Sequence, residues 1–384
     1  MKILKMGMAG GGPGAFIGEV HRKAARLDGG IEVVAGAFDI DPKQSRKQGR
    51  ELGLDKKRVY NDFEEMLAAE SELPKDEQID FVAVTTPNNW HFPIASAALE
   101  AGFHVMCEKP MTLTVKEAEK LRDIVRSKRK VFGLMHNYTG YPMVKLARDM
   151  VACGDLGKIL KIKVQYPQGW LARPIEKSGQ KQASWRTDPK QSGAGCLGDI
   201  GTHAANLAEY ISGLQIKELC ADLSTFIKGR RVEDDANMLL RFTKGAKGVL
   251  HASQIAIGEE NNLAIWVHGT DASIEWHQEN PNYLHLRRID APEEIWKRGN
   301  EYVAAKSAAA ARGTRIPAGH PEGFIEAFAN NYINFADTIR ALDEKRKPNE
   351  LEKDFPNVTD GVRGLKFIEA AINSSGKGGK WVGI

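Results

Sequence analysis

The sequence has few cysteines, no large charge imbalance and no long apolar run. Its four cysteines lie far apart and form no C-x-x-C pair, which argues against a disulfide framework or a zinc ribbon and favours a reducing cytoplasm. No apolar run reaches the ~18 residues that a membrane-spanning helix needs. We interpret the opening stretch, "MKILKMGMAGGG", as a buried strand rather than a signal peptide.

The charge balance gives no sign of a nucleic-acid partner. Lysine and arginine exceed aspartate and glutamate by only 54 − 50 = 4, and the excess is spread along the chain. The basic stretch "RSKRK" is best explained as a solvated helix face. We therefore expect neither nucleic acid nor membrane as a partner. The length of 384 residues predicts two domains.

The first domain is predicted to span residues 1–136. Short β-prone runs alternate there with helical patterns, which is typical of βαβ units and a doubly wound parallel sheet of the Rossmann type. The expected strands are 3–10, 31–38, 79–86, 103–108 and 130–136, and the clearest expected helices are 91–102 and 114–129.

The second domain is predicted to span residues 137–384. Longer β-prone runs follow one another between about 158 and 290, with few helices between them. Helices return at about 322–343 and 360–374, and the stretch 290–320 shows no clear pattern. This texture predicts an α+β domain with a large, mostly antiparallel open sheet.

A glycine-rich turn follows the first expected strand, in "AGGGPGAFIGEVH". Gly10, Gly12 and Ala15 match the G-x-G-x-x-G/A frame, in which glycines let the backbone approach a pyrophosphate at the start of a helix. The frame is weak by itself, and a plain turn is the alternative. A preceding strand and a following helix strengthen it. The loop residues expected to bind the cofactor are Gly10, Gly12, Gly14, Ala15, Phe16 and Ile17.

Asp39 ends the second expected strand, at about the distance where a ribose is recognised. Its charge would repel a 2′-phosphate, so NAD is favoured over NADP. Asp39 could instead cap the helix that Pro42 opens, but Asp41 suits that position better. In the NADP alternative, Lys43 or Arg46 reaches the phosphate while Asp39 turns away.

The segment "TTPNNWH" ends another strand, at the edge of the sheet where open α/β folds bind ligands. Thr86, Pro87, Asn88 and His91 are therefore cofactor candidates. The alternative is that Asn88 or Asn89 caps the helix that begins near His91.

Asp199 and His203 lie four residues apart in "GDIGTH", one turn apart if a helix begins nearby. A metal site would need three or four ligands, and no other ligand pattern accompanies them. A buried structural histidine is a second alternative. A role in proton transfer accounts for the pair better than either alternative. Oxidising an alcohol requires an acceptor for the hydroxyl proton, and imidazole can accept a proton near neutral pH. We favour the acid/base couple.

Glu108, Lys109 and Pro110, with the glycine loop upstream and "GDIGTH" downstream, resemble the Gfo/Idh/MocA (glucose–fructose oxidoreductase/inositol dehydrogenase) family. The resemblance implies an NAD(P)-dependent oxidoreductase acting on sugars or cyclitols. It implies that Lys109 contacts substrate and that Asp199 and His203 form the family's D-x-x-x-H motif. The long glycine loop and "GHPEGF" resemble the branch that contains levoglucosan and glucoside 3-dehydrogenases, which suggests His320 near the sugar. Further candidates are Glu108, Lys109, Asn137, Trp185 and Arg186 for the cofactor, and Lys109, Tyr138 and Trp170 for the substrate.

Together these observations predict an NAD-dependent dehydrogenase of a secondary hydroxyl in a sugar, glycoside or cyclitol, without a metal. Lys109, Asp199 and His203 are the expected catalytic residues. A cytoplasmic homodimer or homotetramer is expected. An NADP-linked reductase is the alternative, and a non-catalytic nucleotide sensor is the alternative from another class.

Overall fold

The computed structural model describes residues 2–384 and divides them into two compact units. The first contains residues 2–136 and Phe328–Val362, and the second contains Asn137–Ala327 and Arg363–Ile384. A single boundary at 136 was expected, so the return of 328–362 to the first unit amends that prediction. Its physical cause is apolar packing: Phe335 is fully buried, and its ring lies 5.1 Å from that of Phe81.

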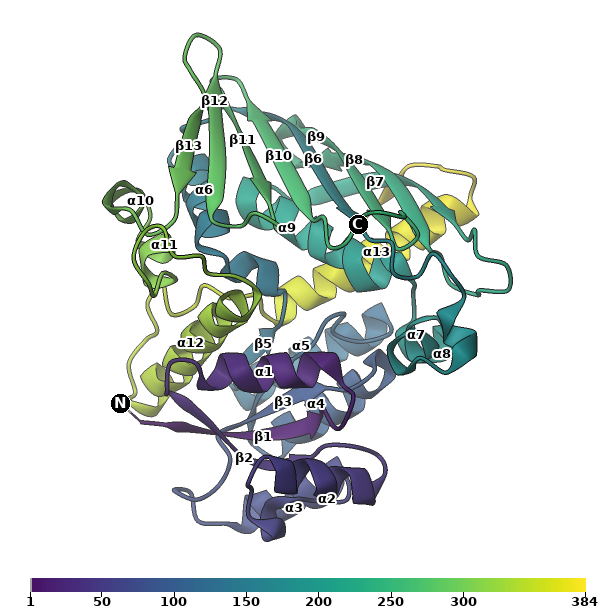
Figure 1. The fold of residues 1–384 in the computed structure, drawn as a ribbon, viewed down its shortest axis with the longest axis vertical. Coiled ribbons are helices and arrows are strands. Elements are labelled where there is room, and N and C mark those ends of the chain that lie inside the picture. The colour runs from purple at the N-terminus through teal and green to yellow at the C-terminus, as the bar shows by residue number, and fades with distance from the viewer. Residues whose placement is uncertain (1) are drawn as a thin grey trace. The chain divides into compact units, whose positions relative to one another are not determined.

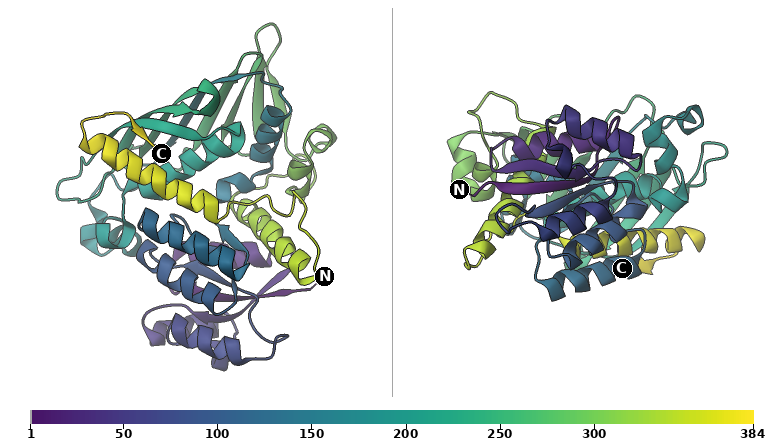
Figure 2. Two further views of the ribbon diagram at one scale, coloured as in Figure 1. Left: turned by 180° about the vertical axis from the view of Figure 1, so that it is seen from behind. Right: turned by 90° about the horizontal axis from the view of Figure 1, so that it is seen from below.

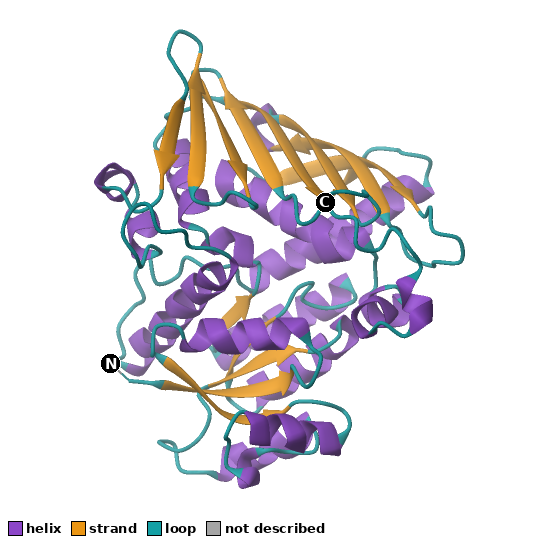
Figure 3. Cartoon of the chain, viewed as in Figure 1, coloured by secondary structure: helices purple, strands orange, loops and turns teal. Residues whose placement is uncertain are grey.

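The first unit contains a five-stranded sheet in the order β2-β1-β3-β4-β5, with every neighbouring pair parallel (Figures 1 and 3). Parallel sheets covered on both faces have nearly continuous apolar strands, as in the fully buried "FVAVT" of β3. The strands are β1 (Leu4–Gly10), β2 (Ile31–Ala37), β3 (Phe81–Thr85), β4 (His104–Cys107) and β5 (Phe132–Leu134). The helices are α1 (Phe16–Arg26), α2 (Pro42–Glu51), α3 (Phe63–Glu72), α4 (His91–Glu100) and α5 (Val115–Lys128).

The strand order places a topological switch point between β1 and β3. The chain leaves β1 toward β2 on one side, whereas β4 extends the sheet beyond β3 on the other. Open α/β sheets bind ligands at the carboxyl ends of strands beside such a point. The glycine loop after β1 and the loop after β3 meet there, since Gly10 pairs with Thr85.

The second unit contains a nine-stranded sheet in the order β13-β12-β11-β10-β6-β9-β8-β7-β14, most of whose strands are labelled in Figure 1. Its neighbouring pairs are antiparallel except β6 with β9. The predicted mostly antiparallel sheet is therefore confirmed. The strands are β6 (Ile159–Pro167), β7 (Ile216–Ser224), β8 (Asp235–Phe242), β9 (Lys247–Ser253), β10 (Ala264–Gly269), β11 (Ala272–His277), β12 (Tyr283–Arg288), β13 (Glu294–Lys297) and β14 (Val382–Gly383).

Side chains alternate between buried and exposed along this sheet, as in β8, where Met238 and Leu240 are buried and Leu239 and Arg241 are exposed. One face therefore forms a core and the other faces solvent. Helices α6, α9 and α13 pack against the buried face (Figures 1 and 2). The helices that lie wholly in this unit are α6 (Pro142–Ala152), α7 (Lys181–Arg186), α8 (Pro189–Ser192), α9 (Thr202–Ser212), α10 (Glu301–Lys306) and α11 (Ala308–Arg312). Helix α12 (Phe324–Asp343) belongs to the first unit from Phe328 onward, and α13 (Val358–Gly376) belongs to the second unit from Arg363 onward.

The stretch 290–320, which showed no clear pattern in the sequence, contains β13, α10 and α11. Both helices are short, of six and five residues, so neither shows a full apolar period. Among residues 2–384, no helix has both the length and the apolar character needed to cross a bilayer.

Candidate functional site

The glycine loop after β1 is shaped by close backbone contacts. Gly10 has a φ of +85°, and a Cβ on it would lie 2.9 Å from the Thr85 carbonyl. A Cβ on Gly18, in the first turn of α1, would overlap the backbone of Gly11. Helix α1 therefore approaches the loop as closely as two glycines allow, which is the third role of glycine in this kind of turn. Gly10 is among the expected cofactor-binding residues, whereas Gly11 and Gly18 are not.

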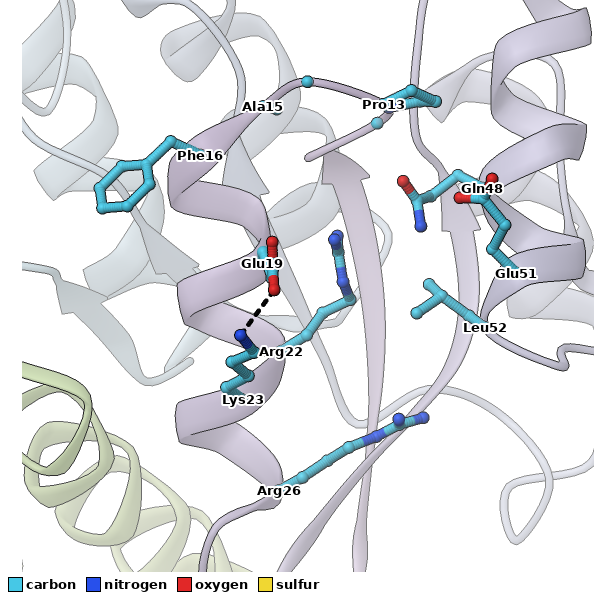
Figure 4. A pocket seen from close by; sticks show the side chains of 12 residues that line it. Pro13, Ala15, Phe16, Glu19, Arg22, Lys23, Arg26, Gln48, Glu51 and Leu52 are labelled. Carbon is cyan, nitrogen blue, oxygen red and sulfur yellow. Dashed lines mark ion pairs between the residues drawn. The ribbon is translucent and has the colours of Figure 1, made fainter.

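A pocket of about 600 Å³ lies beside this loop, between α1 and α2 (Figure 4). Arg22 and Arg26 extend from α1 into the space that faces α2, whereas Phe16 points away. Arg22 is 8% exposed, and its Nη1 donates to the Gly11 carbonyl at 2.7 Å. The guanidinium therefore ties α1 to the glycine loop.

Asp39 lies beside the same loop, at the end of β2. A Cβ on Gly12 would lie 3.2 Å from Asp39 Oδ2, so the carboxylate faces the loop. Asp41 caps α2, since its Oδ1 accepts from the Lys43 backbone N–H at 2.9 Å. The assignment of the cap to Asp41 is thereby confirmed. Arg46, the NADP candidate, donates instead to Asn61 Oδ1 at 2.7 Å.

The loop after β3 carries two buried polar atoms that lack a hydrogen-bond partner, Thr86 Oγ1 and Asn89 Oδ1. The N-cap residue of α4 is Trp90, and Asn89 does not cap this helix because its Oδ1 has no hydrogen-bond partner. His91 is fully buried, and its ring nitrogens lie 2.8 Å from the Pro110 carbonyl and 3.0 Å from the Thr86 carbonyl. Burial lowers the pKa of His91, although both carbonyls favour its charged form. This histidine therefore links the loops that follow β3 and β4.

Glu108 and Lys109 follow β4 directly. Glu108 is 7% exposed, and one of its oxygens lies 2.8 Å from His21 Nε2 on α1. Its other oxygen accepts from the Lys109 backbone N–H at 3.1 Å. Burial is the largest influence and would raise the pKa of Glu108, but the hydrogen bond and charge of His21, together with the charge and backbone N–H of Lys109, outweigh it and lower that pKa. The carboxylate is therefore ionised and held from two sides.

The residues at this edge of the first unit fit a dinucleotide. The glycine loop packs so closely that a Cβ at Gly10 or Gly12 would meet the Thr85 or Phe38 carbonyl, and the start of α1 beside it supplies free N–H groups. The unpartnered hydroxyl of Thr86 is a buried polar group that a ligand can satisfy. Asp39 supplies an acceptor for ribose hydroxyls.

In the second unit, Asp199 lies within a π-helix, Leu197–Gly201, that runs directly into α9. Its Oδ2 accepts from Arg186 Nε at 3.2 Å and from Gln254 Nε2 at 2.8 Å. The structure thus brings together Asp199 and Arg186, two candidates from separate motifs. Gln254 was missed, although it is a buried polar residue just beyond β9.

The π-helix is held by the partly buried carboxylate of Glu233. Glu233 accepts from the backbone N–H groups of Gly195 at 2.7 Å and Leu197 at 3.1 Å. Burial raises the pKa of Glu233 despite these bonds. Single π-turns occur often at functional sites, where the extra residue redirects side chains.

His203 lies in the first turn of α9 and is 6% exposed. Its ring meets the Tyr138 ring edge-on, with centroids 4.8 Å apart. The Tyr138 and Tyr166 hydroxyls are hydrogen-bonded to each other, and Tyr166 donates to Asn261 Oδ1 at 2.7 Å. Phenol and amide groups therefore cluster beside the imidazole. The alternatives of a structural and a proton-accepting histidine are both compatible with this burial.

The remaining candidates have separate positions in the second unit. Trp170 and Trp185 both lie against the Arg186 guanidinium, at 5.9 and 4.2 Å from their ring centroids. His320 is exposed, and its backbone carbonyl accepts from Arg298. Asn137 is buried, and its Nδ2 has no hydrogen-bond partner. Across residues 2–384, no three His, Cys, Asp or Glu side chains group as a metal site would require.

Comparison with known proteins identifies the family. Residues 4–136 match the family described as "Oxidoreductase family, NAD-binding Rossmann fold", and residues 144–275 match "GFO/IDH/MocA C-terminal domain". The uncharacterized oxidoreductase YfiI of Bacillus subtilis is 34% identical over 99% of this chain and 97% of its own length. The chain belongs to the Gfo/Idh/MocA family. It is thus an oxidoreductase with an NAD-binding Rossmann domain, as predicted.

Two further relatives are similar over their whole length. Levoglucosan dehydrogenase of Pseudarthrobacter phenanthrenivorans is 31% identical, over 100% of this chain and 99% of its own. The inositol dehydrogenase homolog of Azotobacter vinelandii, solved with NAD+, has a TM-score of 0.93 and 38% identity, covering 100% of this chain and 98% of its own. The same homolog was also solved with NADH and myo-inositol, with a TM-score of 0.92, 37% identity and the same coverage.

The contact between Gly18 and Gly11 yields a testable prediction. In Gly18→Ala, the added methyl overlaps Gly11 and pushes the loop away from α1, so NADH affinity should fall at least about 10-fold, the effect of a 1.4 kcal/mol loss. NADH fluorescence titration measures this. Gly364→Ala is the matched control, because that helical glycine has open space around it and should bind NADH as wild type does. Equal affinity of Gly18→Ala and the control would contradict the close contact.

Proposed function

We propose that this protein is an NAD-dependent dehydrogenase that oxidises a secondary hydroxyl of a cyclitol, sugar or glycoside. The observation that carries the proposal is the surroundings of His203: a buried imidazole among the hydroxyl and amide groups of Tyr138, Tyr166 and Asn261. Such groups match the donors and acceptors of a polyol. The named relatives, a levoglucosan dehydrogenase and an inositol dehydrogenase homolog solved with myo-inositol, support this substrate class.

Each catalytic residue receives one role. NAD, when bound, supplies the hydride acceptor, which is chemistry that no side chain offers. His203 accepts the hydroxyl proton, and Asp199 supports the resulting imidazolium by its charge. Arg186 and Gln254 hold the Asp199 carboxylate in place. Lys109, at the carboxyl end of β4, binds and polarises the reacting oxygen.

The proposed preference for NAD rests on Asp39. Its carboxylate faces Gly12, where it accepts ribose hydroxyls and repels a 2′-phosphate. In the NADP alternative Arg46 would bind the 2′-phosphate, but its guanidinium donates to Asn61 instead. The proposed cofactor set otherwise keeps the glycine-loop residues and Thr86, Pro87, Asn88, His91, Glu108, Lys109, Asn137, Trp185 and Arg186.

The proposal includes a homo-oligomer in the cytoplasm. The nine-stranded sheet offers an exposed face with Leu239 at 51% exposure, and a second copy could cover it. Within the described residues, the four cysteines are free thiols, which suits a reducing compartment. His320 and Trp170 remain proposed contacts to the substrate.

The direct test is a substrate panel. Purified protein with NAD or NADP is incubated with myo-inositol, other cyclitols, levoglucosan and free sugars, and reduced nicotinamide is followed by absorbance. We expect turnover with NAD for at least one member. NADH binding without turnover across the panel would support the nucleotide sensor instead.

Asp39→Ala tests the cofactor preference. Loss of an acceptor and of a repelling charge should raise the KM for NAD and lower that for NADP, each by about 10-fold, as expected for one charged hydrogen bond. Steady-state kinetics with both cofactors measure the ratio. Thermal unfolding checks that the variant is folded. An unchanged ratio in a folded variant would exclude Asp39 from ribose recognition.

His203→Ala tests the proton acceptor. An acceptor imidazole must be neutral, so kcat/KM of wild type should fall at acidic pH, where the imidazole becomes protonated. The variant should lose about 10²–10⁴-fold in kcat and retain NADH binding. If an active variant kept the same acidic limb, another group would be the base, with Lys109 the first to test by Lys109→Met.

A further inference from the structure

A buried chain of polar groups links three elements of the first unit. His21 on α1 is fully buried, with Nδ1 2.6 Å from the Tyr332 hydroxyl on α12 and Nε2 2.8 Å from Glu108 Oε1 at the end of β4. Phe328 packs edge-on against the imidazole, with ring centroids 5.2 Å apart. Both ring nitrogens therefore have a partner, and apolar packing fixes the ring plane.

The charge states of the two flanking groups are set by their surroundings. Burial, and then the Glu108 charge, raise the pKa of Tyr332 well above its usual range, so Tyr332 stays a phenol. Burial raises the pKa of Glu108, but His21 and Lys109 together lower it by more through their hydrogen bonds and charges, so Glu108 stays a carboxylate. The Nε2–H of His21 therefore donates to an anion, which gives a charge-assisted hydrogen bond.

This chain ends at a proposed catalytic residue. Glu108 uses its second oxygen to accept from the backbone N–H of Lys109 at 3.1 Å. The neighbour of His21 on α1, Arg22, donates to the Gly11 carbonyl. Arg22 thus holds the glycine loop, and the neighbouring His21 holds the end of β4. These two segments carry proposed contacts to the cofactor and the substrate.

We propose that His21, oriented by Tyr332, is a positioning residue that holds the Glu108 carboxylate and, through it, the backbone of Lys109. This inference rests on the proposed function for its effect on turnover. A displacement of about 1 Å at a reacting group costs on the order of 10²-fold in rate, so the anchoring of Lys109 has a measurable consequence.

Stability alone does not account for the arrangement. Replacing a buried ion pair or polar network by apolar residues of similar volume is often neutral or stabilising. Here the side chains of Tyr332, His21 and Glu108 are joined by consecutive hydrogen bonds that end at the Lys109 backbone N–H. Each hydrogen bond fixes the orientation of the next group. Such networks specify geometry more than they add free energy.

The test compares His21→Gln with His104→Gln. His104 lies at the other end of β4, accepts from the Val131 backbone N–H at 2.8 Å and belongs to the same unit, so it controls for loss of a largely buried histidine. We expect His21→Gln to lower kcat 10- to 100-fold with the Kd for NADH changed less than about 3-fold. His104→Gln should keep kcat within about 2-fold, since it lies away from the carboxyl ends of the strands.

Tyr332→Phe keeps the ring and removes only the hydroxyl, so it serves if His21→Gln does not fold. It should lower kcat by about 3- to 10-fold, because His21 then loses the partner that orients it but retains Glu108. Wild-type kcat in a folded His21→Gln, or an equal loss in His104→Gln, would overturn the positioning role. So would wild-type kcat in Tyr332→Phe.

A second readout does not depend on turnover. In protein labelled with ¹⁵N-histidine, the Nε2–H of His21 should give a strongly downfield, slowly exchanging proton signal that is absent from His21→Gln. Glu108→Gln should move this signal upfield, because the acceptor loses its charge. A signal that is missing, or unmoved in Glu108→Gln, would overturn the linkage. If wild type oxidises no substrate but shows the shift, the proposed function fails while the link from His21 to Glu108 stands.

Discussion

The approach of α1 to the loop after β1 is the constraint on which the first unit depends. Side chains at positions 11 and 18 would hold the helix away from the strand, whereas two glycines let the backbones touch. That approach brings Arg22 to the Gly11 carbonyl and His21 to Glu108. Without it, neither bond could form, and the N-terminal N–H groups of α1 would point away from the phosphate position.

Close packing of the backbone also buries charged side chains, and a buried charge needs a partner of opposite charge or a hydrogen bond. Removing one partner of a buried pair costs about 3–5 kcal/mol, since the other charge stays buried alone. Glu108 meets this requirement with His21 and the Lys109 N–H. In the second unit, Arg230 meets it with Glu176 and Asp234. These pairs tie segments together that are far apart in sequence.

The parts that could be predicted from the sequence are those with local signals. The parallel strands appear as continuous apolar runs, and the α2 cap appears as Asp41 before Pro42. The candidate motifs around Lys109 and His203 are also short local strings, and their roles stay predictions. The partners of those motifs are non-local: Glu108 meets Tyr332 through His21, across more than 200 residues of chain. The spacing of apolar residues along the sequence carries no information about such a long-range contact. For the same reason, the return of 328–362 to the first unit was not predicted, because an amphipathic helix does not reveal which core it joins.

The contacts of Arg186 limit which faces of the nearby tryptophan rings are open to a ligand. Its guanidinium lies 4.2 Å from the centroid of Trp185 and 5.9 Å from that of Trp170, while its Nε donates to Asp199. A face of each indole that meets a cation is not open to a sugar ring, so stacking is confined to the opposite faces. Trp276, 1% exposed in the core, offers no face at all. Trp170 and Trp185 therefore both contact the guanidinium that donates to Asp199. Under the proposed function, sugar recognition then falls mainly to the phenol and amide groups beside His203, which match hydroxyls by hydrogen bonding rather than by stacking.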